Sequence, residues 1–143
     1  MRTKILLLFL AAGLLCMMLL PGCSSNQNTV TANIYHNATA HYNGYFYALE
    51  KTLEVEKVVL KSLDDDPNQI LRLFPKLDTT LAKSYAKDTE EIIKMASISI
   101  QRHPNSQWVD DNYIQVGLAR LYSCDYQNAI QTFKYVNTKS PRS

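Results

Sequence analysis

The sequence predicts an all-α fold of antiparallel helical hairpins, on the basis of three observations. First, 46% of the 143 residues are hydrophobic and 20% are charged, which is typical of one compact domain. Second, the chain has only 4 glycines, so few positions weaken a helix. Third, apolar residues recur at steps of three and four over residues 33–63, 78–102 and 105–141. We therefore expect two long helices within residues 32–104 and a helix–turn–helix within residues 105–143.

The start of the chain has the features of a cleaved signal peptide. Arg2 and Lys4 precede an apolar run of about 16 residues, which is shorter than the roughly 20 residues that span a bilayer. The run ends in the sequence LPGC, which resembles the lipobox of bacterial lipoproteins. The resemblance implies cleavage after residues 1–22, attachment of acyl chains such as palmitate at Cys23, and a polar tether over residues 23–31. The alternative is an ordinary secretory signal in which the cysteine is incidental.

The net charge of the full chain comes from this first segment. The chain has 15 Lys and Arg against 13 Asp and Glu, and loss of Arg2 and Lys4 leaves 13 of each. The small basic excess therefore gives no reason to expect a nucleic-acid partner. Of the three cysteines, Cys16 is removed and Cys23 carries lipid, so Cys124 has no partner for an internal disulfide. We expect Cys124 to be a small structural residue at a turn.

The residues after Cys23 bear on the location of the chain. The tether contains no acidic side chain. Surface-exposed lipoproteins of the Bacteroidetes often carry acidic residues at this place. The resemblance to lipoproteins therefore implies an anchor in the outer membrane that faces the periplasm.

Residues 33–63 contain a tyrosine-rich stretch that allows two structures. The pair Asn43-Gly44 between aromatic residues favours a β-hairpin. However, apolar residues continue at helical steps through the segment, and residues 48–61 are rich in helix formers. We predict one long helix that is weakened at Gly44. Its predicted buried stripe consists of Tyr35, Ala38, Tyr42, Tyr45, Leu49, Leu53, Val59 or Leu60, and Leu63.

Three tyrosines of this helix are candidate partner-binding residues. They are Tyr35, Tyr42 and Tyr45, and His36 and His41 lie beside them. Either the rings pack on the next helix while the hydroxyl groups reach solvent, or they form a platform for a ligand or a partner.

A second long helix is predicted over residues 78–102. Its apolar stripe comprises Leu81, Tyr85, Ile92, Ala96 and Ile100, with Ala82, Ala86 and Ile93 beside it. The acidic sequence at 64–67 ends the first helix, and His103-Pro104 ends the second. We expect the two long helices to form a degenerate first repeat.

Residues 105–143 match the pattern of a 34-residue tetratricopeptide repeat. The matching positions are Tyr113, Val116, Gly117, Ala129, Phe133, Val136 and Pro141. Two antiparallel helices approach closely only where side chains are small, so we expect Gly117 and Ala129 at the crossing. Asp125 is placed to cap the second helix and Pro141 to end it. The match predicts a fragment of a tetratricopeptide-repeat-like solenoid.

Two positions depart from this pattern. Tyr113 stands where Trp is usual, and Arg120 stands where an aromatic residue is usual. We expect Leu121 or Tyr122 to fill the gap while the Arg120 side chain extends outward.

The inner face of this repeat supplies further candidates for partner binding, namely Ile114, Leu118 and Leu121, together with Asp111. Exposed apolar residues on such a face suit a partner segment. The alternative is that they pack against the preceding helices.

The sequence contains no pattern that predicts catalysis. His36 and His41 are spaced unlike zinc ligands on one helix face, and no HExxH, CxxC, GxSxG or glycine-rich phosphate loop occurs. We expect no enzymatic activity, cofactor, bound metal or small-molecule substrate.

Three stretches together resemble one family. They are the lipobox, the sequence YHNATAHYNGYFYALEK that begins at Tyr35, and the sequence HPNSQWVDDNYIQVGLARLYSCDYQNAIQTF that begins at His103. They resemble the N-terminal part of the gliding-motility and type IX secretion lipoproteins of the PorW/SprE type. The resemblance implies a scaffold whose partners are proteins of the secretion and motility machinery. Members of that family are longer, and a lone repeat cannot bury its faces. We therefore expect the chain to be an N-terminal piece that is either truncated after this repeat or packed against a natural partner.

Two alternatives fit the combination of lipobox and repeat. One is a lipoprotein of outer-membrane protein assembly, and the other is a glycan-binding lipoprotein. The tyrosine-rich stretch favours the secretion family over the assembly lipoproteins. The helical spacing of its aromatic residues disfavours the glycan-binding lipoproteins, which place aromatics on inserted loops.

Overall fold

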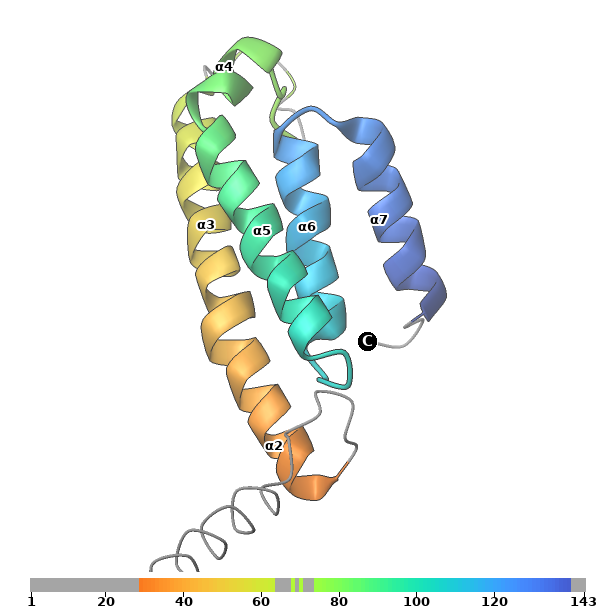
Figure 1. Ribbon diagram of the computed structural model, residues 1–143. Helices are drawn as coiled ribbons and strands as arrows, with labels where there is room; N and C mark the ends of the chain where they lie inside the picture. Colours follow the sequence, from red (N-terminus) through yellow and green to blue (C-terminus); the bar gives the residue numbers. More distant parts are fainter. Residues whose placement is uncertain (1–28, 64–67, 69, 71–73, 140–143) are drawn as a thin grey trace, which may run out of the picture.

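The computed structural model describes residues 29–63, 68, 70 and 74–139, and every regular element in these residues is helical. The prediction of an all-α fold is confirmed. The elements are α2 (Val30–Thr39), η1 (Ala40–Tyr45), α3 (Phe46–Lys61), α4 (Thr79–Ser84), α5 (Ala86–Arg102), α6 (Val109–Tyr122) and α7 (Tyr126–Lys139). In Figure 1, α3, α5, α6 and α7 lie side by side, and α2 extends beyond the loop that joins α5 to α6.

The first three elements form one continuous helix, as predicted for the tyrosine-rich segment. The segment η1, which includes Gly44, is a π-helical turn. The predicted buried stripe was wrong, however, because Tyr35, Tyr42 and Leu53 are exposed. The buried row instead consists of His36, Ala40, Gly44, Ala48, Thr52, Val55 and Val59.

The π-helical turn explains the difference between the predicted and the observed row. The buried row from His36 to Thr52 advances by four residues at every step. In a regular α-helix, four such steps would rotate the row by about 160° around the axis. A π-helical turn contains more residues per turn, so it keeps the row closer to one face.

The row is lined with small residues because the long helix lies very close to α5. A Cβ atom added at Gly44 would collide with the Cβ and Oγ atoms of Ser99 on α5. Ala40 and Ala48 on either side of Gly44 are also buried. The absence of a side chain at Gly44 is therefore a requirement of the helix packing.

The predicted helix over residues 78–102 is interrupted once. It begins as predicted at Asp78, whose side chain accepts a hydrogen bond from the backbone N–H of Thr80 at 3.1 Å. At Tyr85 the backbone leaves the helical region, with φ −118° and ψ 18°. The break accompanies the burial of the Tyr85 ring, whose hydroxyl donates to the carbonyl of Tyr122 at 3.1 Å. Ala86, predicted beside the stripe, is exposed.

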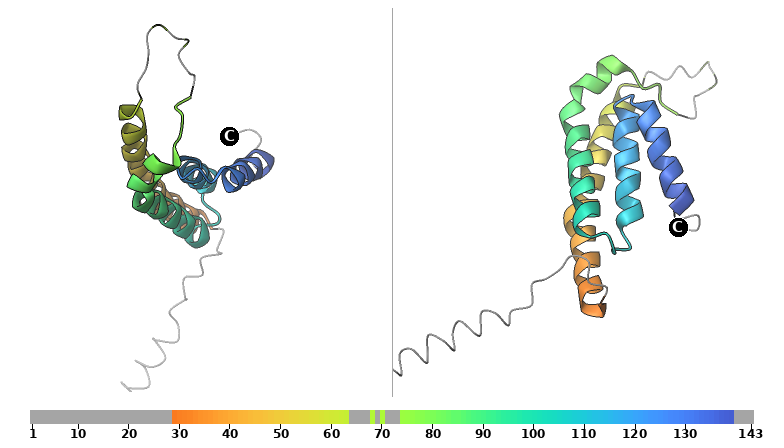
Figure 2. Two further views of the ribbon diagram at one scale, coloured as in Figure 1. Left: turned by 90° about the horizontal axis from the view of Figure 1, so that it is seen from above. Right: turned by 45° about the vertical axis from the view of Figure 1, so that its right-hand side comes forward.

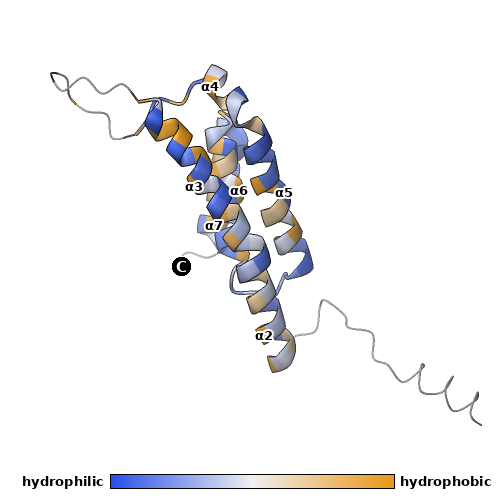
Figure 3. Cartoon of the chain, turned by 90° about the vertical axis from the view of Figure 1, so that its left-hand side faces the viewer, coloured by the Kyte–Doolittle hydropathy of each residue, from blue (hydrophilic) through white to orange (hydrophobic). Residues whose placement is uncertain are grey.

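The hydrophobic core lies between α3, α5 and α6. It contains Val55 and Val59 from α3, Ile92 and Ala96 from α5, and Val116 and Ala119 from α6, among others. Figure 3 shows hydrophobic and hydrophilic residues alternating around α3, as expected for a helix with one buried face. Figure 2 shows α7 on the far side of α6 from α3, so α7 packs mainly on α6.

The hairpin of α6 and α7 has the predicted close crossing. A Cβ atom added at Gly117 would lie 2.5 Å from Cε1 of Phe133, and Ala129 on α7 is buried. The prediction that the Arg120 side chain extends into solvent was wrong. Its Nη1 atom donates to Oγ1 of Thr132 on α7 at 2.8 Å, while the Tyr122 ring packs against the core.

The turn between α6 and α7 is a Schellman motif. The N–H of Asp125 donates to the carbonyl of Arg120 at 2.9 Å, and the N–H of Cys124 donates to that of Leu121 at 3.0 Å. Cys124 has φ 61°, a left-handed conformation that glycine usually adopts at this position. The Cys124 side chain is half-buried against the core, which agrees with a structural role.

Candidate partner-binding site

The structure separates the predicted site residues into two groups. Tyr35, Tyr42 and Tyr45 lie on α2 and η1, whereas Ile114, Leu118 and Leu121 lie on α6. The predicted lipidation site, Cys23, lies outside the described residues, as do Ser143 and Pro141.

The three tyrosines do not form a single platform. Tyr35 and Tyr42 are 62% and 65% exposed, and each ring packs edge-on against a neighbouring histidine. Tyr45 is half-buried, and its ring stacks on Trp108 with a centroid distance of 5.1 Å. Tyr45 therefore holds the helix against the loop after α5, and Tyr35 and Tyr42 are the two rings available to a partner.

A buried pair of histidines joins α2 to the loop after α5. Nδ1 of His36 lies 2.8 Å from Nδ1 of His103, and both side chains are buried. At this distance one ring donates a hydrogen bond to the other, so one Nδ1 atom carries a hydrogen and the other accepts. Burial lowers the pKa of His103, and the charges of His36 and Arg102 act in the same direction. Helical periodicity could not reveal this pair, because its members are 67 residues apart along the chain.

Aromatic stacking extends this junction toward η1. The ring of His41 lies 3.9 Å from that of Trp108, between centroids. The adjacent loop residue Gln107 donates its backbone N–H to Oδ1 of Asn37 at 2.9 Å. His41 and Trp108 are therefore packing residues that position α6 relative to η1.

Asp111 lies in the first turn of α6. Burial raises the pKa of Asp111, and the charge of the adjacent Asp110 adds to this effect.

Polar side chains position α6 against α3 in the interior. The hydroxyl of Thr52 donates to Oε1 of Gln115 at 2.7 Å, and both residues are buried. The Thr52 hydroxyl also lies 2.8 Å from the carbonyl oxygen of Ala48 on its own helix. A shift of the two helices would therefore leave the buried Gln115 side chain without this partner, which favours the observed position.

The α6 candidates differ in accessibility. Ile114 is exposed, whereas Leu118 and Leu121 are half-buried. Next to Ile114, the Tyr113 ring contacts the Tyr135 ring of α7 at a centroid distance of 4.8 Å. Packing within the bundle therefore takes up part of the predicted inner face, and Ile114 remains its most accessible apolar residue.

The described part of the chain holds no group of three or more His, Cys, Asp or Glu residues that could bind a metal ion. Within the same residues, none of the helices has the length and apolar character that crossing a membrane requires. The surface of the described residues carries exposed aromatic and apolar side chains, including Tyr35, Tyr42 and Ile130.

Comparison with protein-family models, with curated proteins and with solved structures found no match. A functional proposal for this chain therefore has to rest on its sequence motifs and on the geometry of its helices.

Proposed function

We propose that this protein is a lipid-anchored scaffold of tetratricopeptide-repeat type, held at the outer membrane and facing the periplasm. It supports type IX protein secretion and gliding motility through protein–protein contacts. The observation that carries the proposal is the stacking of the helices. α3 packs on α5, α5 on α6 and α6 on α7, and α3 also reaches α6. Successive hairpins of a helical repeat pack in this manner.

The crossing of α6 and α7 supports the repeat assignment. The pattern of the repeat requires small residues where its two helices meet. Gly117 lies close to Phe133 of α7, and Ala129 of α7 is buried. A long side chain at Gly117 would separate the two helices. The close approach of α6 and α7 at Gly117 therefore supports the repeat assignment.

The surface of the stacked helices has the composition of a binding surface. On α7, Tyr126, Ile130 and Tyr135 are each exposed by 45% or more. On the long helix, Tyr35 and Tyr42 are exposed to a greater extent. Aromatic and apolar residues of this kind are enriched in contacts between proteins. A scaffold role uses these residues without further chemistry.

The anchor is tested by comparing Cys23→Ala with Cys16→Ala. Both changes replace a cysteine in the first segment, but only Cys23 occupies the lipidation position of the lipobox. We expect labelled palmitate to be incorporated into the wild type and into Cys16→Ala, and not into Cys23→Ala. Incorporation into all three proteins, or into none, would contradict a lipid anchor at Cys23.

The scaffold role is tested by purifying the same three proteins from native membranes in mild detergent. We expect type IX secretion or motility proteins to be recovered with the wild type and Cys16→Ala, and to be lost with Cys23→Ala. Recovery of outer-membrane assembly proteins instead would support the assembly alternative. Recovery of a glycan without proteins would support the glycan-binding alternative.

A further inference from the structure

A groove between η1 and α5 combines a cavity with unpaired positive charges. The cavity has a volume of about 370 Å³, within the size range of binding sites for small ligands or short peptide segments. The wall formed by η1 includes Asn43 and Gly44. The other wall is formed by one face of α5, on which Lys94, Ile98 and Arg102 follow one another at intervals of four residues.

The positive charges of this groove are not neutralised within the described chain. Neither Lys94 nor Arg102 makes an ion pair or a side-chain hydrogen bond with any described residue, and both are exposed. Glu91, the carboxylate that lines the same groove, lies 3.9 Å from Lys51. Lys51 also contacts Glu54 and Asp88, each at 3.1 Å. Glu54, Asp88 and Glu91 therefore gather around Lys51, and among the described residues the two groove cations have no ion-pair partner.

An apolar surface lies between these two cations. Ile98 and Met95 are 37% and 39% exposed and both line the cavity. Because an α-helix rises by about 1.5 Å per residue, the backbone positions of Lys94 and Arg102 are about 12 Å apart, with Ile98 halfway. The α5 wall thus presents a cation, an apolar residue and a second cation at intervals of about 6 Å.

An extended peptide can match this spacing. In a β-strand, alternate residues point to the same face, and each pair of residues advances by about 6.6 Å. An acidic, an apolar and an acidic residue at alternate positions therefore span about 13 Å on one face. We propose that the groove binds an extended segment of the form acidic-x-apolar-x-acidic, supplied by a partner protein. The acidic residues pair with Lys94 and Arg102, and the apolar residue lies on Ile98 and Met95. This inference rests on the proposed scaffold function, because it specifies the partner segment that the scaffold recognises.

The test uses the full chain purified in mild detergent and a fluorescein-labelled peptide, Ser-Glu-Ser-Leu-Ser-Glu-Ser. Fluorescence anisotropy measures its binding. We expect a Kd on the order of 10 μM. Replacing both glutamates of the peptide by glutamine should weaken binding by at least about tenfold, since the charge pairs are lost. Replacing leucine by glycine should also weaken it, because the contact with Ile98 is lost.

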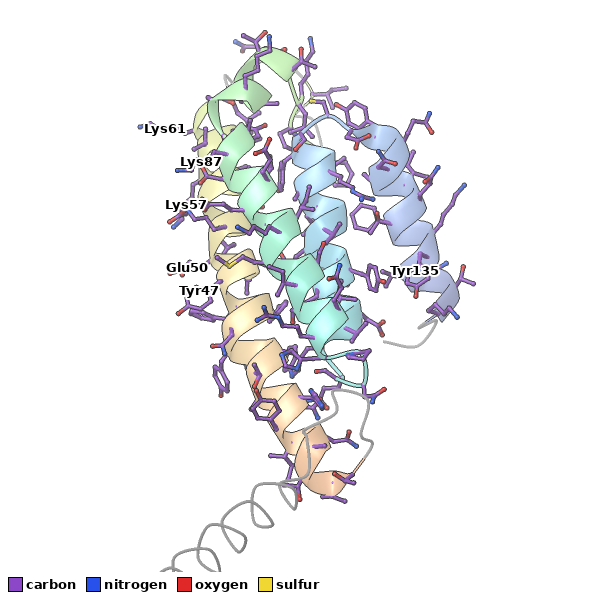
Figure 4. The ribbon with its side chains drawn as sticks, viewed as in Figure 1. Tyr47, Glu50, Lys57, Lys61, Lys87 and Tyr135 are labelled. Atoms are coloured by element: carbon purple, nitrogen blue, oxygen red, sulfur yellow. The ribbon has the colours of Figure 1, made fainter. Side chains whose placement is uncertain are left out.

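The matched protein variants reverse two charges inside or outside the groove. Lys94→Glu with Arg102→Glu should weaken binding by at least about tenfold. Lys57→Glu with Lys87→Glu changes the net charge equally, but these side chains point outward from the bundle in Figure 4 and should leave the Kd within about twofold. All four residues are exposed, so we expect the far-UV circular dichroism of both variants to match the wild type. The milder pair Lys94→Gln with Arg102→Gln should give an intermediate loss.

Several results would overturn the groove proposal. They are an absence of binding at about 1 mM peptide, equal binding of the glutamine peptide, and equal weakening by the two charge-reversal variants. Displacement of the peptide by inorganic phosphate at about 1 mM would also overturn the proposal, because the groove would then be a general anion site.

A final comparison separates this inference from the scaffold proposal. If Lys94→Glu with Arg102→Glu retains the secretion proteins that Cys23→Ala loses, the groove is not the partner site and the scaffold proposal stands. If the peptide binds as expected but the wild type recovers no secretion or motility protein, the groove proposal stands and the type IX assignment fails.

Discussion

The two ends of the helical bundle are held together by different chemistry. At the end near α4, Val55, Val59, Tyr85 and Ile92 form an apolar core, which we name the apolar end. At the end near α2, His36 pairs with His103 while His41 stacks on Trp108, and we name this the histidine end. Apolar packing depends on shape, whereas a histidine pair depends on protonation. We therefore expect a change of pH to alter the stability of the histidine end and to leave the packing of the apolar end unchanged.

The largest expected effect is the loss of a core side chain at the apolar end. Ile92 is 0% exposed, so Ile92→Ala leaves a cavity and should lower the free energy of unfolding by about 2–5 kcal/mol. Ile98→Ala on the same helix removes a partly exposed side chain and should cost less than about 1 kcal/mol. Urea unfolding followed by circular dichroism measures both. Equal losses would show that Ile92 is not in a close-packed core.

The two close glycine contacts give the next largest effect. Gly44→Ala brings a Cβ atom against Ser99, close to the backbone of α5, and should destabilise the fold by about 1–2 kcal/mol after the better helix propensity of alanine is included. Gly117→Ala meets the ring of Phe133, which is half-buried and can move, so we expect a change within about 1 kcal/mol. Urea midpoints measure both variants.

The control for the glycine comparison removes the opposing side chain. Ser99→Gly should restore part of the stability that Gly44→Ala loses, since the collision is then relieved. If Ser99→Gly adds its own loss independently, the close approach of η1 and α5 is not the cause.

The pH dependence of stability tests the histidine end directly. Because the pKa of His103 is lowered in the folded state, the unfolded chain binds more protons as the pH falls below the ordinary value of 6.5. The stabilisation that His103 contributes in its neutral form is therefore fully present above pH 6.5. It decreases as the pH falls below 6.5, and the decrease ends once the pH is below the lowered pKa of the folded state. We expect the Tm to be lower at about pH 5.5 than at about pH 7.5, a range that excludes most carboxylate titration.

His103→Gln should be less stable at neutral pH and should show a smaller change of Tm across this range. His41→Gln is the matched control, because it alters the same junction and leaves the His36 and His103 pair in place. An unchanged pH dependence in His103→Gln would show that other groups cause it. Asp111, whose pKa is raised above its ordinary 3.8, acts in the opposite direction, since its folded form holds a proton more strongly.

The smallest effect is expected at the ion-pair network between α3 and α5. Hydrogen bonds to Asp88 and Glu54 raise the pKa of Lys51, yet these groups are accessible to water and salt. Lys51→Gln should change the urea midpoint only slightly, and the difference should shrink further in about 1 M salt. A large loss that persists in salt would contradict this view of the network.

The sequence predicted the helices and one of their contacts correctly. The steps of three and four residues located the long helix despite the Asn43-Gly44 pair, and the position of Pro104 marked the end of α5 at Arg102. The repeat pattern identified the crossing at Gly117. These features depend on local backbone preferences or on a spacing that is encoded within one hairpin, so a single sequence contains them.

Other features could not be predicted from periodicity. The stripe with Tyr35 and Tyr42 was assigned to the wrong face, because the π-helical turn changes the number of residues per turn inside the helix. The break at Tyr85 accompanies a hydrogen bond to Tyr122 on another helix, and periodicity carries no information about that contact. The division of the candidate tyrosines also depends on tertiary structure. Tyr45 is packed because Trp108 of the neighbouring loop covers its ring, whereas Tyr35 and Tyr42 are exposed.

The sequence by itself thus determined the helical class, the extents of most helices and the small residues at the hairpin crossing. The tertiary structure decided which histidines meet, where the helix widens at η1, and which cations of α5 have no ion-pair partner among the described residues. The physical reason is the range of the interactions. Helix formation and capping act over a few residues, whereas the His36 and His103 contact and the groove at Lys94 arise only when distant segments pack together.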